Sequence, residues 1–168
     1  IDHNAIDLRI WQWMTWKYDV QGILVWQTSY WNSPQRARES GQLQNPWEDP
    51  MGWRSSGGGW WGNGDGRFIY PPNVDPNTEH EPILTGPVDS IRWEHLRDGI
   101  EDYEYLCLLR QRLEQHQPRL SAPDLAAFAK LLEVPETITR TLTQFAPDGA
   151  PIEAHRRAVG RALEKLGR

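Results

Sequence analysis

SIRWEHLRDGIEDYEYLCLLRQRL, residues 90–113, decides how the rest of this sequence is interpreted. Its apolar residues recur at helical spacing and predict one long helix with a core-facing side. They are Ile91, Trp93, Leu96, Ile100, Tyr103, Leu106, Cys107, Leu109 and Leu113. Ser90 precedes this set and is expected to cap the helix by accepting a hydrogen bond from a backbone N–H group. Gly99 costs about 1 kcal/mol relative to alanine in mid-helix, which favours close packing against another backbone.

The other side of this helix is strongly charged. Three acidic residues are expected to be solvated, namely Glu94, Glu104 and Glu114. Four more charged residues lie between large apolar side chains, namely Arg97, Asp98, Glu101 and Asp102. Two interpretations of these four stay open, a solvated face or a partly buried ionic network. In both readings the role of these charges is structural.

The N-terminal segment predicts an α/β unit. Residues 5–18 form a helical pattern that is apolar on nearly every face, so this helix needs burial on several sides. After Gly22, residues 23–26 (ILVW) are a continuous apolar run, which is typical of a strand covered on both faces in a parallel sheet. A helix, a short loop and a buried strand in this order indicate a βα architecture.

Polar and aromatic residues follow the predicted strand directly. The segment QTSYWN, residues 27–32, lies where a barrel places its active site, at the carboxyl ends of the strands. We therefore take Trp26, Tyr30 and Trp31 as candidate binding residues. For any single tryptophan, packing in a core remains the commoner role.

Residues 33–89 are long, irregular and rich in glycine and proline. A solvated linker would not carry so many aromatic residues, so a functional loop is favoured over disorder. The glycines of SSGGGWWGNGDG resemble a phosphate loop only superficially, because neither GK[ST] nor GxGxxG with a following helix is present. The Asp-Gly pair predicts a tight turn that leads into a short strand at residues 67–70. Trp60, Trp61 and Asp65 join the candidate binding residues.

The C-terminal part predicts helices without a functional site. Residues 126–132 follow a helix-start pattern, residues 136–145 are expected to form another short helix, and residues 152–166 an amphipathic last one. We expect two domains: residues 1–117 with the terminal βα units of a barrel, and residues 118–168 as a helical extension that packs outside it.

Charge and composition exclude several classes of partner. The whole net charge of −5 arises before Ser90, a part that also holds 9 of the 10 tryptophans. An acidic, tryptophan-rich surface suits neutral sugar rings and not phosphate backbones, so carbohydrate is the expected partner and nucleic acid is not. No run approaches the roughly 18 apolar residues of a membrane span, which predicts a soluble protein. The single Cys107 excludes an internal disulfide and a thiolate zinc cluster, and is expected to be a small core residue.

Length indicates that a barrel would be incomplete. A complete (β/α)8 barrel typically needs about 250 residues, whereas this sequence has 168 and opens on Ile1 within motif-like sequence. We expect the C-terminal portion of a (β/α)8 barrel, within an α/β fold, and a partner in the preceding part of the same protein. A metal site would have to use His3, His80 and His95, which lack any paired ligand spacing. No metal or cofactor is predicted.

SIRWEHLRDGIEDYEYL resembles the C-terminal signature of bacterial proteins related to glycoside hydrolase family 123. Three upstream segments resemble that family in the same order: RIWQWMTWKYDVQGILVWQTSYW, NPWED and GNGDGRFIYPP. The resemblance covers residues 1–113. It implies a barrel hydrolase that acts on β-linked N-acetylgalactosamine with assistance from the substrate's own acetamido group, and whose adjacent Asp-Glu pair lies on an earlier strand.

The resemblance therefore implies that the catalytic carboxylates precede this chain. Two acidic pairs are present, Glu48-Asp49 in a proline-flanked loop and Glu101-Asp102 in a helix, and neither suits the role. The expected contribution of the chain is a sugar-binding wall in a hydrolase of N-acetylhexosamine-containing glycans. The alternative is a carbohydrate-binding or structural module without chemistry.

Overall fold

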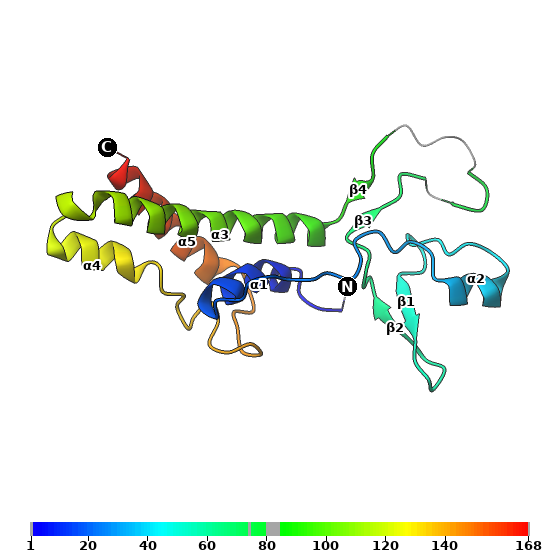
Figure 1. Cartoon of the computed structure of the whole chain (residues 1–168). Helices are drawn as coiled ribbons and strands as arrows, with labels where there is room; N and C mark the ends of the chain where they lie inside the picture. The colour runs from blue at the N-terminus through cyan, green and yellow to red at the C-terminus, as the bar shows by residue number, and fades with distance from the viewer. Residues whose placement is uncertain (1, 74, 80–84, 168) are drawn as a thin grey trace. The chain divides into compact units, whose positions relative to one another are not determined.

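The structure is a computed structural model that describes residues 2–73, 75–79 and 85–167 (Figure 1). The chain forms two compact units. One comprises Ile1–His3 and Leu24–Glu94, and the other comprises Asn4–Ile23 and His95–Arg168. We call the first the loop unit and the second the helical unit.

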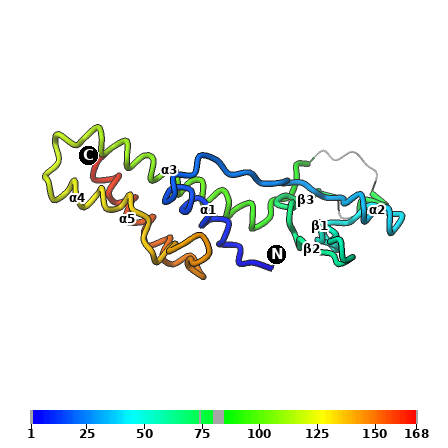
Figure 2. The backbone as a smooth tube through the Cα atoms, turned by 60° about the horizontal axis from the view of Figure 1, so that its bottom comes forward, coloured from blue at the N-terminus to red at the C-terminus, as the bar shows by residue number. Residues whose placement is uncertain are grey.

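The helical unit consists of helices that share one apolar core. They are α1 (Ile6–Lys17), most of α3 (Ile91–His116), the short 3-10 helix η1 (Gln117–Arg119), α4 (Ala122–Lys130) and α5 (Ala150–Leu166). Figures 1 and 2 show α4 and α5 running along the C-terminal part of α3. The buried apolar residues are Ile6, Ile10, Trp13, Met14, Leu106, Leu109, Leu113, Ile138, Ala146, Ile152, Val159, Ala162 and Leu166. The predicted helices at the N-terminus, from residue 90, and at the C-terminus are thus confirmed.

The long helix α3 begins at Ile91 and is capped by Ser90, as predicted. The Ser90 hydroxyl accepts from the backbone N–H of Trp93 at 3.3 Å and donates to the carbonyl oxygen of Phe68 at 2.5 Å. The buried positions are Gly99, Asp102, Leu106, Leu109 and Leu113, which lie on one stripe of the helix. Ile91 and Ile100 fall outside this stripe and are exposed, so the predicted apolar stripe is wrong at these two positions.

A buried ionic network joins three helices of the helical unit. Asp102 is 1% exposed and accepts from Arg9 Nε of α1 at 2.7 Å and from Arg156 Nη1 of α5 at 2.9 Å. The indole N–H of Trp13 donates to the same carboxylate at 3.0 Å. Burial alone would lower the pKa of Arg9, but hydrogen bonds and the charges of Asp102 and Glu153 raise it above its usual range. Of the two readings of these charges, the buried network holds for Asp102, while Arg97 stays exposed.

Gly99 allows α1 and α3 to approach closely. A Cβ atom at this position would lie 2.9 Å from both the carbonyl oxygen of Arg9 and Cγ of Gln12. These distances are shorter than van der Waals contact, so only glycine fits here without a shift of α1. The predicted close backbone contact is confirmed.

In its described residues, the loop unit contains one short helix and four short strands. Helix α2 (Pro34–Ser40) is followed by β1 (Met51–Arg54), β2 (Trp60–Asn63), β3 (Ile69–Tyr70) and β4 (Val88–Asp89). Strands β1 and β2 form an antiparallel hairpin, and β3 pairs antiparallel with β4. The predicted tight turn and short strand near residues 65–70 are confirmed, whereas the β1–β2 hairpin and α2 were not predicted.

Two predicted elements are wrong. Residues 23–26 form no strand: Leu24 is 82% and Trp26 63% exposed, and among the described residues no strand lies beside them to pair with their backbone. Residues 136–145 form turns and an isolated bridge between Thr139 and Phe145, because threonine hydroxyls take up the local backbone groups. Thr141 Oγ1, for example, accepts from the backbone N–H groups of Thr143 and Gln144.

The described residues form a mixed fold of helices and short strands. The described residues combine helices with two small two-stranded sheets, which agrees with mixed α/β content, and their strands close no barrel. None of the helices in the described ranges is both long and apolar enough to cross a bilayer.

Candidate functional site

Backbone pairing within the loop unit brings two predicted site segments together. Ser29 forms an isolated antiparallel bridge with Arg67, and the N–H of Tyr30 donates to the carbonyl oxygen of Gly66 at 2.7 Å. The N–H of Phe68 donates to the carbonyl oxygen of Thr28 at 2.8 Å. The segment that follows the apolar run therefore lies directly beside the turn that carries Asp65.

Three aromatic rings form a row at this turn. Tyr30 stacks on Trp53 of β1 with ring centroids 4.7 Å apart and planes 10° apart. Trp53 faces Trp61 across the β1–β2 hairpin, with centroids 6.1 Å apart. Trp61 ends the row and is 52% exposed, so this indole offers a ring surface to a ligand. We call these three rings the aromatic row.

An exposed carboxylate lies at the aromatic row. Asp65 Oδ2 accepts a hydrogen bond from the indole N–H of Trp53 at 2.7 Å. Gly62 makes this arrangement possible, because a Cβ atom there would lie 2.5 Å from Trp53 Cδ1 and 3.2 Å from Asp65 Cβ. Gly62 also has φ 76°, a left-handed conformation that favours glycine. An apolar ring surface and a hydrogen-bond acceptor on the same turn can hold a polar ring such as a sugar.

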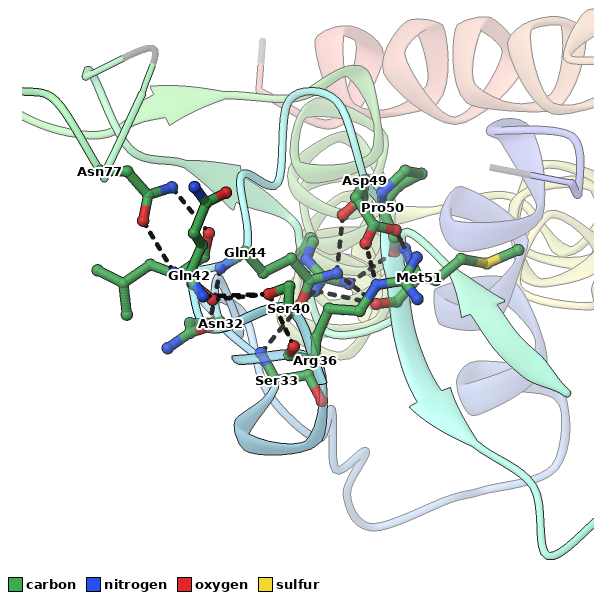
Figure 3. Close-up of polar contacts among 12 residues, drawn as sticks. Asn32, Ser33, Arg36, Ser40, Gln42, Gln44, Asp49, Pro50, Met51 and Asn77 are labelled. Carbon is green, nitrogen blue, oxygen red and sulfur yellow. Dashed lines mark hydrogen bonds and ion pairs between the residues drawn. The ribbon is translucent and has the colours of Figure 1, made fainter. Parts of the chain in front are cut away.

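A buried polar hub supports the strand that carries Trp53 (Figure 3). The side-chain amide of Gln44 donates to the carbonyl oxygens of Asp49 at 2.9 Å and Met51 at 2.7 Å. Its Oε1 accepts from the Ser33 N–H at 3.0 Å and from Arg67 Nη2 at 2.9 Å. The hub fixes the start of β1 relative to the segment that follows Asp65.

Arg67 is the charged member of this hub and is fully buried. Its Nη1 donates to the carbonyl oxygen of Pro50 at 2.6 Å, and its guanidinium carbon lies 5.6 Å from the centre of the Tyr30 ring. Burial lowers the pKa of Arg67, and the nearby charge of Asp49 partly offsets that effect. Arg67 thus packs near the Tyr30 ring of the aromatic row and, because it is buried, is not accessible to a ligand.

The remaining predicted site residues lie in the same unit but have other contacts. Trp26 is highly exposed in an irregular segment. The indole N–H of Trp31 donates to the carbonyl oxygen of Ile69 at 2.8 Å, which ties its segment to β3. The ring of Trp60 is covered by the Arg36 guanidinium, whose carbon lies 4.4 Å from the ring centre. The structure therefore brings Tyr30, Trp61 and Asp65 together.

Sequence reasoning missed Trp53 as a member of the site. Its place in the aromatic row depends on the β1–β2 hairpin, which was not predicted. The sequence does contain a signal for the hairpin, because two aromatic segments, MGWR and WWGN, flank the glycine-containing turn SSGGG. Such spacing is typical of a hairpin with a longer loop, and cross-strand neighbours in a hairpin contact each other.

Neither acidic pair is placed for glycoside hydrolysis. Asp49 pairs with Arg36 Nε at 2.5 Å, and Glu48 is an exposed turn residue. Asp102 is buried between two arginines, and Glu101 pairs with Arg156 at 3.0 Å. The hydrolytic carboxylates need access to the scissile bond, which Asp102 lacks.

Histidines and the single cysteine are further reactive groups of the chain. Within residues 2–73, 75–79 and 85–167, no group of three potential ligand side chains gathers in a metal-binding arrangement. His80, one of the histidines considered for metal, lies outside the described residues. Burial raises the pKa of the Cys107 thiol, and the charge of Glu104 adds to this effect, so a thiolate nucleophile is disfavoured there.

Comparison with known proteins supports the resemblance of the sequence motifs. A search among curated proteins finds no match to this chain. The family model described as "Glycoside hydrolase 123, catalytic domain" matches residues 1–109, a range that includes the aromatic row, Asp65 and the first two-thirds of α3. Because this match extends over more than half of the 168 residues, the chain belongs to glycoside hydrolase family 123.

Proposed function

We propose that this chain supplies a sugar-binding wall to a glycoside hydrolase that acts on N-acetylhexosamine-containing glycans. The observation that carries the proposal is the pairing of an exposed indole, Trp61, with an exposed carboxylate, Asp65, at one turn of a family 123 catalytic domain. Trp61 stacks on the apolar face of a sugar ring, and Asp65 accepts a hydrogen bond from one of its hydroxyl groups. The other wall residues are Trp26, Tyr30, Trp31 and Trp60.

The hydrolytic carboxylates belong to a preceding part of the same protein in this proposal. Support comes from the two acidic pairs of this chain: Asp102 is buried between Arg9 and Arg156, and Asp49 pairs with Arg36. The resemblance to family 123 implies an Asp-Glu pair on an earlier barrel strand. Residues 1–117 then represent the final βα units of the barrel, and residues 118–168 a helical extension of it.

The wall contributes modestly to affinity. Burying one apolar sugar face against an indole stabilises the complex by about 1 kcal/mol at ~25 cal/mol per Å². Association also costs translational and rotational freedom, so a single stacked face gives only weak binding. Tight binding therefore requires contacts from the rest of the active site.

A titration tests the proposal. N-acetylgalactosamine is added to the full protein while tryptophan fluorescence is followed, and Trp61→Ala is compared with the unchanged protein. Loss of about 1 kcal/mol weakens affinity roughly fivefold. The matched control is Trp11→Ala, which removes a partly exposed indole from α1 in the helical unit. Equal affinity of all three proteins would show that the sugar binds elsewhere.

A non-catalytic carbohydrate-binding or structural module is the second candidate. It is favoured by one observation, that the described strands of this chain carry no pair of adjacent carboxylates at their ends. The sequence before Ile1 separates the two functions. An Asp-Glu pair at the end of a predicted strand there supports the hydrolase, and an unrelated domain supports the module.

A further inference from the structure

We infer that Trp53 is a positioning residue: its indole N–H fixes the Asp65 carboxylate so that the other carboxylate oxygen receives a sugar hydroxyl. This inference rests on the proposed sugar-binding function and assigns a role that neither the family match nor the sequence motifs assign. Trp53 itself contributes little ring surface to a ligand, because Tyr30 and Trp61 both contact its ring.

The hydrogen-bond pattern of Asp65 supports this role. Its Oδ2 accepts from Trp53 Nε1 at 2.7 Å, a short distance typical of a hydrogen bond to a charged acceptor. Among the described residues, Oδ1 accepts no hydrogen bond, and the residue is exposed. A free aspartate on a turn would sample several rotamers, and each would present its oxygens differently. One donor at Oδ2 selects a single orientation and leaves one defined acceptor.

The indole of Trp53 is itself held on several sides. Tyr30 stacks on it nearly parallel, and Trp61 packs against it from the neighbouring strand. The absence of a side chain at Gly62 provides the space for its five-membered ring, whose Cδ1 lies 2.5 Å from the position of a Cβ atom there. The strand that carries Trp53 is tied by Met51 to the buried hub of Gln44 and Arg67. A rigid donor makes the orientation of Asp65 reproducible.

A double-mutant cycle tests the inference in the full protein, with binding of N-acetylgalactosamine as the measurement. Trp53→Phe keeps an aromatic ring on Tyr30 but removes the N–H donor together with part of the ring surface. Asp65→Ala removes the acceptor, and the double variant combines both. We expect Trp53→Phe alone to weaken binding about two- to tenfold, the effect of one hydrogen bond. In the Asp65→Ala background the same change should have no further effect, because residues that act through one another are not additive.

Trp47→Phe is the matched control. It also removes an indole N–H donor of the loop unit, but that donor binds the carbonyl oxygen of Pro71 at 3.1 Å. Trp47→Phe should leave affinity unchanged. Melting temperatures of all variants verify folding, and a parallel titration with the monodeoxy analogues of N-acetylgalactosamine identifies the hydroxyl. Trp53→Phe should not weaken binding of the analogue that lacks it.

The outcomes separate this inference from the proposed function. If Asp65→Ala weakens binding and Trp53→Phe does not, the positioning role is wrong and the sugar-binding wall stands. If Trp53→Phe weakens binding equally in both backgrounds, or if Trp47→Phe does the same, Trp53 acts through packing and the inference is overturned. If Asp65→Ala leaves binding unchanged, Asp65 binds no hydroxyl and both ideas fail.

Discussion

Asp102 connects three helices of the helical unit. Its carboxylate accepts hydrogen bonds from Arg9 and Trp13 of α1 and from Arg156 of α5. Removing one partner of a buried ion pair leaves an uncompensated charge, which is more costly than the net value of the pair. This position is therefore more sensitive to substitution than the exposed acids on the same helix.

We predict that Asp102→Ala destabilises the protein by about 3–5 kcal/mol, because two guanidinium groups lose their buried counter-charge. Urea unfolding followed by circular dichroism measures the change. The control is Glu101→Ala, which removes the neighbouring, half-exposed partner of Arg156 and should cost less than about 1 kcal/mol. Similar losses for the two variants would mean that burial of Asp102 has no special energetic role.

Gly62 determines the geometry of the aromatic row. We predict that Gly62→Ala destabilises the loop unit by about 1–2 kcal/mol, because φ is 76° there and the new methyl group would overlap the Trp53 indole. The near-ultraviolet circular dichroism of the stacked rings should fall with it. Gly57→Ala, in the turn of the same hairpin, meets only Ser55 Oγ at 3.9 Å and should leave the spectrum intact. An unchanged spectrum in Gly62→Ala would show that the indole has room to move.

At the level of elements, sequence periodicity predicted the helices well. Residues 90–113 and 152–166 carry repeating apolar positions and helix-start residues, and these local signals persist in α3 and α5. The predicted strand at residues 23–26 is wrong because no such local signal supports it. A continuous apolar run has no periodicity of its own, and a strand also needs neighbours for its backbone hydrogen bonds, which the described residues do not provide.

The candidate site was predictable only in part. The position after the apolar run selected Tyr30, and the tryptophan- and glycine-rich composition of residues 33–89 selected Trp61 and Asp65. Predicting Trp53 as a site residue requires the cross-strand pairing between residues 51–54 and 60–63. This pairing is a long-range feature that single-residue patterns do not contain. The covered face of Trp60 likewise depends on Arg36, which lies 24 positions earlier in the chain.

The contact between α1 and α3 allows a paired test of helix packing. We predict that Gly99→Ala destabilises the protein by about 1–2 kcal/mol, since overpacking against the backbone of Arg9 outweighs the gain of about 1 kcal/mol in helix propensity. Gly99→Leu should be worse. Gly160→Ala in α5 meets only Tyr105 Cε1 at 3.7 Å, so it should stabilise by up to about 1 kcal/mol. Stabilisation by both alanines would contradict the close contact at Gly99.

At the scale of the whole molecule, a chain can belong to a hydrolase family without carrying the residues that hydrolyse the substrate. The match to the catalytic domain of glycoside hydrolase family 123 over residues 1–109 shows that the chain belongs to this family. Hydrolysis by this family's chemistry requires an acid and an orienting carboxylate near the scissile bond. In the two acidic pairs, Asp102 and Glu101 are engaged by Arg156, Asp49 pairs with Arg36 and Glu48 is exposed on a turn, while Asp65 accepts from Trp53.

We therefore predict that the purified 168-residue chain does not hydrolyse nitrophenyl N-acetylhexosaminides, even though its residues 1–109 match the model of the catalytic domain. Release of nitrophenol measures this directly, and the full protein serves as the positive control in the same assay. Asp65 and Glu48 are exposed carboxylates of the loop unit. Turnover by the chain alone that disappears in Asp65→Ala or Glu48→Ala would place the catalytic group within residues 33–89 and make the wall itself the active site.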